Sequence, residues 1–254
     1  MKNSSTLRRL WALAILMLAW RAGPASAIEP FRITTAVLPP FAIEADRKNP
    51  GALVEVVEEL TRRAKVLAPI EFVPWKRAIL LSQHDARTAI FPLTRNRARE
   101  TAYRWLVKLY SDSTVFTARS GGLDLRDPAA LKNLRVAVVR ESSNQDQLRD
   151  DGFSQIVDVA DVRAAMKLLH EGLVDLAYGT ETVYRDAPKS LGYAESAFKY
   201  SVGVHSFDLW LGGSRDFGEA DAAELQSAMK AMVKDGTYVR ILQKYTMRLP
   251  AAAR

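Results

Sequence analysis

Three arginines at every second position are the residues of this sequence best suited to binding chemistry. Arg95, Arg97 and Arg99 follow a short apolar stretch at 88–91 and Pro92. The planar guanidinium of arginine carries a fork of N–H donors that matches a carboxylate bidentately. An arginine near the end of a strand, beside backbone groups that a proline leaves unpaired, indicates a small-anion site. The alternative is solvated loop arginines, which we favour for Arg95 and Arg97.

Residue patterns typical of catalysis or cofactor binding are absent from the sequence. It has no cysteine, no Gly-x-Ser-x-Gly elbow, no phosphate-binding glycine loop and no Gly-x-Gly-x-x-Gly after a strand. The three histidines lack the spacing of metal ligands: His84, His170 and His205. We therefore expect neither a cofactor nor a metal, and nothing in the sequence requires an enzyme.

Alternating strands and helices position the arginines. In the first half of the chain, the apolar periodicity predicts strands over 31–37, 70–73 and 88–91 and helices over 51–65 and 75–83. Pro92 is predicted to end the third strand. An alternating aromatic run over 103–109 and a β-rich stretch over 113–117 follow.

A second alternating unit begins after a polar break at 119–122. Strands are predicted over 134–139, 156–159, 174–178 and 209–213, and helices over 144–151, 162–171, 219–234 and 237–245. A further helix is expected to start near residue 181. Two α/β units joined without a long linker predict two lobes with a ligand cleft between them.

The first 27 residues have the features of an export signal. Lys2, Arg8 and Arg9 precede an uncharged apolar run over 10–20 and a small-residue cleavage site at 25–27. The run is shorter than the roughly 20 residues that a membrane-spanning helix needs. We therefore predict a signal peptide over residues 1–27 and a mature protein in the periplasm.

The charge of the remaining chain argues against nucleic acid as a partner. The formal net charge is +7, from 36 basic and 29 acidic residues. Four of the basic residues and no acidic residue lie in the first 27 positions, which leaves 32 against 29, or +3. This bias is too weak to indicate nucleic acid or an anionic membrane surface.

Several short motifs occur in the order of one known family. They are Pro39-Pro40-Phe41, the run Thr94-Arg95-Asn96-Arg97-Ala98-Arg99-Glu100, Gly172-Leu173-Val174-Asp175, and Asp235-Gly236-Thr237. In this order the sequence resembles the extracellular solute-binding proteins of family 3, the periplasmic receptors of polar-amino-acid ABC importers. The resemblance extends along essentially the whole mature chain.

The resemblance implies a two-lobed α/β fold of the type II periplasmic-binding-protein class. Each lobe is a mostly parallel sheet flanked by helices, and the chain crosses between lobes at two hinge segments, here near 116–120 and 204–208. Lobe 1 is then expected over 28–117 and 206–254, and lobe 2 over 118–205. We expect a monomer whose lobes close on the ligand by a hinge motion before a membrane permease recognises it.

The resemblance also assigns ligand-binding residues. The position of Arg99 clamps the ligand's carboxylate, while the Thr94 hydroxyl and the Pro92 carbonyl point at its polar head. In the second lobe, Ser142 and Ser143 supply donors near a helix N-terminus, which suits an anion. Trp75 is either an aromatic wall of the cleft or an ordinary core residue.

Three positions depart from the family pattern. Leu38 stands where many relatives have a tyrosine, Glu141 where glycine is common, and Thr180 where amino-acid receptors carry an aspartate for the ligand's ammonium. A hydroxyl cannot neutralise an ammonium in a closed cleft. Unless Glu181 or Glu141 replaces that aspartate, we expect an organic acid or a modified amino acid rather than a standard one.

The leading interpretation is a non-enzymatic receptor that delivers a small carboxylate-bearing solute to an ABC importer. One alternative is an enzyme on the same scaffold, similar to the cyclohexadienyl dehydratases, for which Glu141 and Glu181 are the candidate acids or bases. The other alternative is a periplasmic sensory protein that signals its bound state to a membrane partner.

Overall fold

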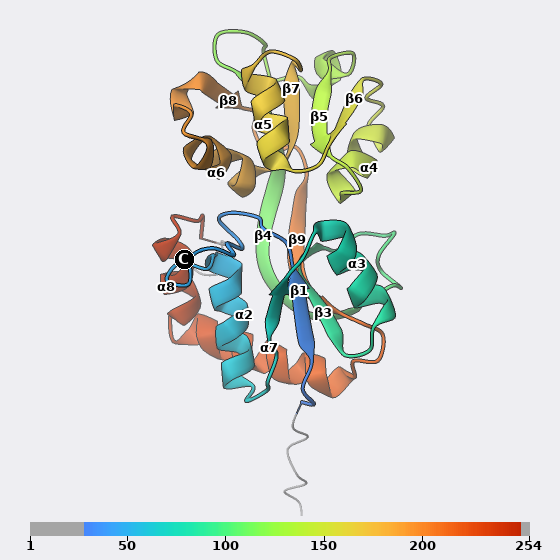
Figure 1. The fold of residues 1–254 in the computed structure, drawn as a ribbon, viewed down its shortest axis with the longest axis vertical. Helices are drawn as coiled ribbons and strands as arrows, with labels where there is room; N and C mark the ends of the chain where they lie inside the picture. Colours follow the sequence, from blue (N-terminus) through green and yellow to red (C-terminus); the bar gives the residue numbers. More distant parts are fainter. Residues whose placement is uncertain (1–27, 250–254) are drawn as a thin grey trace, which may run out of the picture.

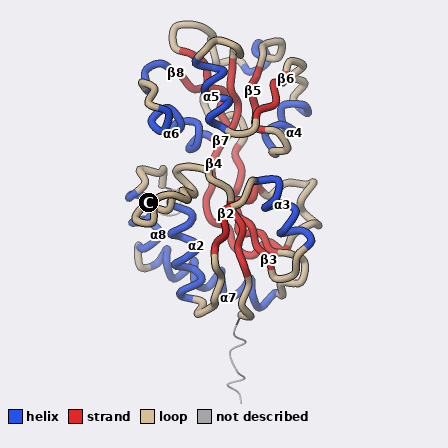
Figure 2. Tube along the Cα trace, viewed as in Figure 1, coloured by secondary structure: helices blue, strands red, loops and turns tan. Residues whose placement is uncertain are grey.

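Two α/β lobes, joined by two long strands, make up the computed structural model, which describes residues 28–249 (Figure 1). In each lobe the strands lie in the middle and helices cover them (Figure 2). The predicted two-lobed α/β fold is therefore confirmed. The predicted signal peptide, residues 1–27, lies outside the described residues.

The lower lobe in Figure 1 has the strand order β2-β1-β3-β9-β4. These strands are β2 (Ile70–Phe72), β1 (Arg32–Thr35), β3 (Thr88–Thr94), β9 (Ser206–Gly213) and β4 (Arg104–Arg119). β1 is parallel to β2 and β3, whereas β9 is antiparallel to β3 and β4.

Helices cover both faces of this sheet. Helices α2 (Ala52–Arg63), α7 (Glu219–Lys234) and α8 (Thr237–Lys244) bury one apolar stripe each in the main core. Helix α3 (Trp75–His84) packs on the other face, where its Ala78 joins a small cluster around Ile90 and Leu93. The apolar residues of α2 recur at helical spacing, so burying this stripe holds the helix against the sheet.

The upper lobe is built on β5 (Val136–Val139), which is parallel to β6 (Ile156–Val159) and β7 (Leu176–Thr180). β7 and the short β8 (Phe198–Tyr200) pair antiparallel with the far half of β4. Helix α4 (Ser143–Asp150) covers one face, and α5 (Val162–His170) with α6 (Glu181–Leu191) covers the other. Two 3₁₀ turns, Pro128–Leu131 and Glu195–Ala197, complete the lobe.

Strand β4 belongs to both lobes. It pairs with β9 as far as Ser113 and with β7 from Thr114 onward. This change of partner falls just before the predicted crossing at 116–120, and no glycine or proline interrupts the strand there. The division into lobe 1 (28–117 and 206–254) and lobe 2 (118–205) stays a prediction.

One sequence-based expectation about strands is wrong. Pro92 does not end β3, which continues to Thr94. The pairing of β3 with β9 is irregular between Ile90 and Leu93, and a proline is tolerated there because the ladder does not use its missing N–H. The alternating run at 103–109 and the β-rich stretch at 113–117 belong to one long strand, β4, which begins at Arg104.

Candidate functional site

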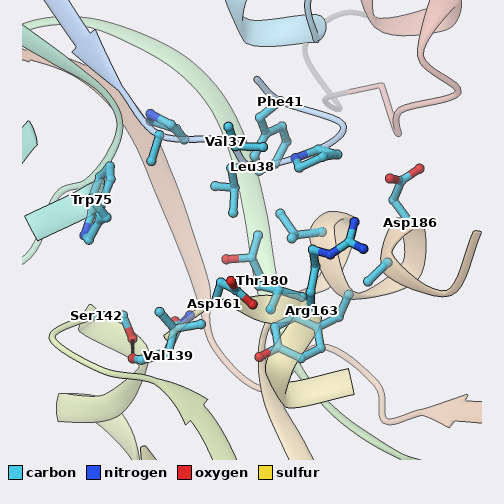
Figure 3. Close-up of a pocket in the computed structure, with 18 of the residues that line it drawn as sticks. Val37, Leu38, Phe41, Trp75, Val139, Ser142, Asp161, Arg163, Thr180 and Asp186 are labelled. Atoms are coloured by element: carbon cyan, nitrogen blue, oxygen red, sulfur yellow. Dashed lines mark hydrogen bonds between the residues drawn. The ribbon is translucent and has the colours of Figure 1, made fainter. Parts of the chain in front are cut away.

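A cavity of about 600 Å³ lies between the two lobes and is lined by residues of both. Figure 3 shows its walls, with Leu38 and Trp75 from the first lobe facing Ser142 and Thr180 from the second. All eight residues expected around the ligand line this cavity: Leu38, Trp75, Pro92, Thr94, Arg99, Ser142, Ser143 and Thr180. The structure thus brings together residues that lie up to 142 positions apart (38 to 180).

Arg99 reaches the cavity from the turn between β3 and β4. Its backbone N–H donates to the Asn96 side chain at 3.0 Å, which fixes the turn. Its guanidinium is half-buried and donates to the Thr94 carbonyl at 3.3 Å, while no carboxylate of residues 28–249 forms an ion pair with it. Burial lowers the pKa of Arg99 below its usual value. A half-buried guanidinium without a counter-ion favours the binding of an anion.

The other two arginines of the run differ from Arg99. Arg95 donates twice to the Glu100 carboxylate and lies over the rings of Trp105 and Trp210. Arg97 is exposed, and neither arginine lines the cavity. Arg97 therefore agrees with a solvated loop arginine, whereas Arg95 is held at the surface by Glu100 and the two tryptophans.

The first-lobe wall of the cavity is largely apolar. Leu38 follows β1 and begins a tight turn in which its N–H donates to Ala42 at 2.9 Å. Trp75 is the first residue of α3, after Pro74 at the N-cap, and packs beside the cluster around Leu93. An apolar wall with one guanidinium suits a ligand that has one charged end and a nonpolar body.

The start of α4 forms part of the second-lobe wall. Ser142 is the N-cap: its hydroxyl accepts from the Gln145 N–H at 3.3 Å and donates to the Val139 carbonyl at 2.6 Å. Ser143, the next residue, lines the cavity with no hydrogen bond to its hydroxyl among residues 28–249. Ser142 therefore holds the helix start in place, and Ser143 has a hydroxyl available to a ligand.

Glu141 precedes this helix in an uncommon backbone conformation. Its φ of 59° lies in the left-handed region that glycine adopts most readily, which accounts for the glycine expected at this position. Its carboxylate accepts from Lys76 of the other lobe at 2.9 Å, beside a smaller pocket that adjoins the cavity. Glu141 does not line the main cavity.

Glu181 does not replace the missing aspartate either. Its carboxylate accepts from the Ser113 hydroxyl at 2.7 Å and from Arg185 at 2.8 Å, and it is outside the cavity wall. Thr180 lines the cavity at the end of β7, where its side chain makes no capping bond to α6. The side chain at 180 is thus available to a ligand but carries no charge.

Three charged residues and a tyrosine that the sequence analysis did not find are among those that line the second-lobe wall: Asp161, Arg163, Tyr184 and Asp186. Asp161 is the N-cap of α5 and accepts from the Ala164 N–H at 2.8 Å. An aspartate directly before a predicted helix at 162–171 is a detectable capping signal. Arg163, Tyr184 and Asp186 have no local sequence pattern that marks them, because they come together only through the packing of α5 against α6.

A buried carboxylate lies where the two lobes join. One oxygen of Asp112 accepts from the Ser113 N–H at 2.8 Å, and the other is buried with no partner among residues 28–249. Burial, with a smaller contribution from the neighbouring Glu181 carboxylate, raises the pKa of Asp112 to about 6, although hydrogen-bond donors of Thr182 and Ser113 act in the opposite direction. The hinge therefore holds a group that changes charge near neutral pH.

Within residues 28–249, three or more His, Asp or Glu side chains never gather in an arrangement that could hold a metal ion. In the same part of the chain, no helix is long and apolar enough to cross a membrane. The cavity offers two guanidinium groups, three carboxylates, several hydroxyls and a largely apolar first-lobe wall, which is chemistry suited to binding.

Comparisons with known proteins agree with this architecture. The family model of the bacterial extracellular solute-binding proteins, family 3, matches residues 32–248. No curated protein matches the sequence.

Many solved structures share the fold. An ancestral arginine-binding protein bound to arginine has a TM-score of 0.75 at 17% identity, covering 86% of this chain and 99% of its own. The arginine-, lysine-, histidine-binding protein ArtJ from Geobacillus stearothermophilus has a TM-score of 0.77 at 16% identity, covering 87% and 97%. A histidine kinase sensor domain with similarity to periplasmic binding proteins has a TM-score of 0.77 at 14% identity, covering 85% and 95%.

Proposed function

We propose that this chain, which belongs to the bacterial extracellular solute-binding proteins of family 3, is a periplasmic receptor for a small carboxylate-bearing solute. It captures the solute between its two lobes and delivers it, as a monomer, to an ABC importer. Arg99 is the observation that carries the proposal: it is half-buried, lines the cavity and has no protein carboxylate among residues 28–249 to neutralise it.

The roles of the other wall residues follow from this anchor. Thr94 and Pro92 lie beside Arg99 and receive the polar head of the solute, while Ser143 offers its hydroxyl from the second lobe. Trp75 and Leu38 pack on the solute's nonpolar part. Residues from both lobes contact one solute, so binding favours a closed arrangement.

Two experiments test the receptor function. Mass spectrometry of ligand released from the purified protein is expected to identify a compound with a carboxylate. Small-angle X-ray scattering with that compound at saturation is expected to give a smaller radius of gyration than the ligand-free protein. A released compound without an acidic group, or an unchanged radius at saturation, would contradict the carboxylate or the closure, respectively.

An enzyme on this scaffold is the weaker alternative. The two carboxylates that the sequence offers as acid or base, Glu141 and Glu181, form ion pairs outside the main cavity. Incubation with prephenate tests this alternative directly, and we expect no turnover above the spontaneous rate. Sustained release of product would establish the enzyme instead.

A sensory role stays open as the third candidate. One specific observation favours it: the histidine kinase sensor domain shares the fold at a TM-score of 0.77. Co-purification from the membrane fraction with ligand present distinguishes an importer partner from a signalling partner. We expect capture of a permease, and capture of a kinase or cyclase would decide for the sensor.

A further inference from the structure

The second-lobe wall extends the cavity beyond the residues that the receptor role uses. Figure 3 shows Trp75 and Ser142 at one end, Arg163 and Asp186 at the other, and Thr180 with Asp161 between them. We call the part of the wall that runs from Asp161 to this second end, formed by Asp161, Arg163, Tyr184 and Asp186, the α5–α6 recess. A cavity of about 600 Å³ has room for more than a carboxylate and a short chain.

Asp186 is a carboxylate that lacks a protein partner. It lies in the second turn of α6 and is half-buried. Within residues 28–249 it makes neither an ion pair nor a side-chain hydrogen bond. Burial raises the pKa of Asp186 by penalising its charged form, and the charge of Lys189 offsets this only in part. A cation placed beside it would offset this cost.

Tyr184 lies in the same wall and in the core of the second lobe. Its side chain is 2% exposed, and its hydroxyl is buried with no hydrogen-bond partner among residues 28–249. Burial raises the pKa of Tyr184, and the nearby Asp161 carboxylate adds to this effect. Because the hydroxyl is closed off from the cavity, Asp161 and Asp186 are the acidic groups of this wall that a ligand meets.

The net charge of the recess indicates whether a ligand group bound there is cationic or anionic. Asp161 and Asp186 supply two carboxylates against the single guanidinium of Arg163. Arg163 forms no ion pair with any carboxylate of residues 28–249 and can neutralise only one of them on closure. The recess is therefore net negative, whereas the opposite end is positive at Arg99.

We propose that the α5–α6 recess is a second subsite that receives a cationic amine or guanidine of the solute, held by Asp161 and Asp186 with Tyr184 beside them. This inference rests on the proposed function, in which Arg99 holds the carboxylate. Arg99 lies toward the α4 end of the cavity, where Asp146 is among the charges that influence it. The solute class is thus a carboxylic acid whose basic group sits at the far end of an extended chain.

Isothermal titration calorimetry on the mature protein, stripped of ligand by unfolding and refolding, tests the subsite. The probes are 4-aminobutanoate, 6-aminohexanoate and 8-aminooctanoate, with hexanoate, hexanedioate and 1,6-diaminohexane as references. We expect the best amino acid of the series to bind at least tenfold more tightly than hexanoate. Asp161→Asn and Asp186→Asn should each reduce that affinity about tenfold and leave hexanoate binding unchanged.

The matched control is Glu171→Gln, which removes one negative charge from the far end of α5, outside the cavity. It should change none of the affinities. Tighter binding of hexanedioate than of any amino acid, with that preference lost in Arg163→Gln, would overturn the proposal in favour of an anion subsite. Equal binding of 6-aminohexanoate and hexanoate would also overturn it.

The same titrations separate the subsite from the receptor function. If the acids bind through Arg99 and the amino group adds nothing, the function holds and the subsite fails. If no acid binds but 1,6-diaminohexane binds and loses affinity in Asp186→Asn, the subsite holds and the carboxylate clamp fails. If no probe binds, both are overturned.

Discussion

The two walls of the cavity are built from different chemistry. The first-lobe wall is mostly apolar, with Val37, Leu38 and Trp75, and carries a single cation, Arg99, and a single carboxylate, Glu44. The second-lobe wall carries serines, a threonine, aspartates and an arginine at the starts and inner faces of α4, α5 and α6. The first wall can anchor any small acid, whereas the second determines which polar groups the rest of the acid must carry.

The difference between the walls follows from where each is made in the chain. Arg99 and Thr94 come from one continuous run at the end of β3, so their relation is set locally. The second wall is assembled from the ends of β5, β6 and β7 and from three helix starts. Side chains at the carboxyl ends of parallel strands meet at one edge of a sheet, where ligands commonly bind.

The largest effect is expected from the anchor of the first wall. Arg99→Ala should weaken binding of the identified ligand by about 3 kcal/mol, because a charge-assisted bidentate contact is lost in a partly desolvated site. Arg97→Ala is the matched control; its side chain is exposed, and its loss should cost less than about 1 kcal/mol. Calorimetry on both variants measures the difference, and equal losses would remove the distinction between the arginines.

A second prediction concerns the hinge that joins the walls. Asp112 has a folded-state pKa of about 6, above its unfolded value, so its charged form destabilises the fold above pH 6 and this effect disappears below about pH 4. Asp112→Asn should therefore raise the free energy of unfolding at pH 7.5 by about 2 kcal/mol, and the gain should shrink as the pH falls through 6 to 4.

Urea unfolding at pH 7.5 and pH 4.5 measures this gain, with Asp150→Asn, an exposed aspartate at the end of α4, as the control. Because Asp112 is in neither wall, its replacement should change the affinity for all ligands by the same factor. A ligand-dependent change would mean that the hinge takes part in selectivity.

The third prediction tests the apolar surface of the first wall. Trp75→Ala should weaken binding by about 1.5 kcal/mol through the loss of nonpolar contact and stacking. Trp105→Ala, which removes an aromatic ring outside the cavity, should leave affinity within about twofold of the unchanged protein. Thermal unfolding of both variants checks that the small cluster beside Trp75 stays packed. Equal losses of affinity would assign Trp75 to the core instead of the wall.

The two walls also differ in how far the sequence predicts them. The motif at 94–100 is contiguous, and both the two-lobed fold and the convergence of all eight expected residues on one cavity follow from the order of local patterns. Asp186 and Arg163 could not be found in this way, since they meet only through the packing of α5 on α6. Glu181 was a reasonable candidate by sequence proximity, but its ion pair with Arg185 holds it outside the cavity.

The smallest effect, and the one that tests the second wall most directly, is expected at Thr180. Thr180 is the N-cap of α6 without a capping bond, and it lines the cavity. In Thr180→Asp, a carboxylate both caps the helix and faces the ligand, so we expect stability to rise by about 0.5 kcal/mol. We also expect the affinity for standard amino acids to rise about fivefold, or roughly 1 kcal/mol, because their ammonium gains a counter-charge.

Thermal unfolding and calorimetry against the twenty amino acids and a set of keto, hydroxy and dicarboxylic acids give both quantities. Ser190→Asp, which places the same new charge on α6 nearly three turns further along the cavity wall, is the control. If the second wall selects by position, Thr180→Asp should favour α-amino acids and Ser190→Asp should not. Micromolar binding of an ordinary amino acid to the unaltered protein, unaffected by Glu141→Gln and Glu181→Gln, would contradict the assignment of a non-standard ligand. If that binding is lost in Asp161→Asn, then Asp161, at the start of α5, supplies the counter-charge for the ammonium. The family carries that charge at position 180, at the end of β7.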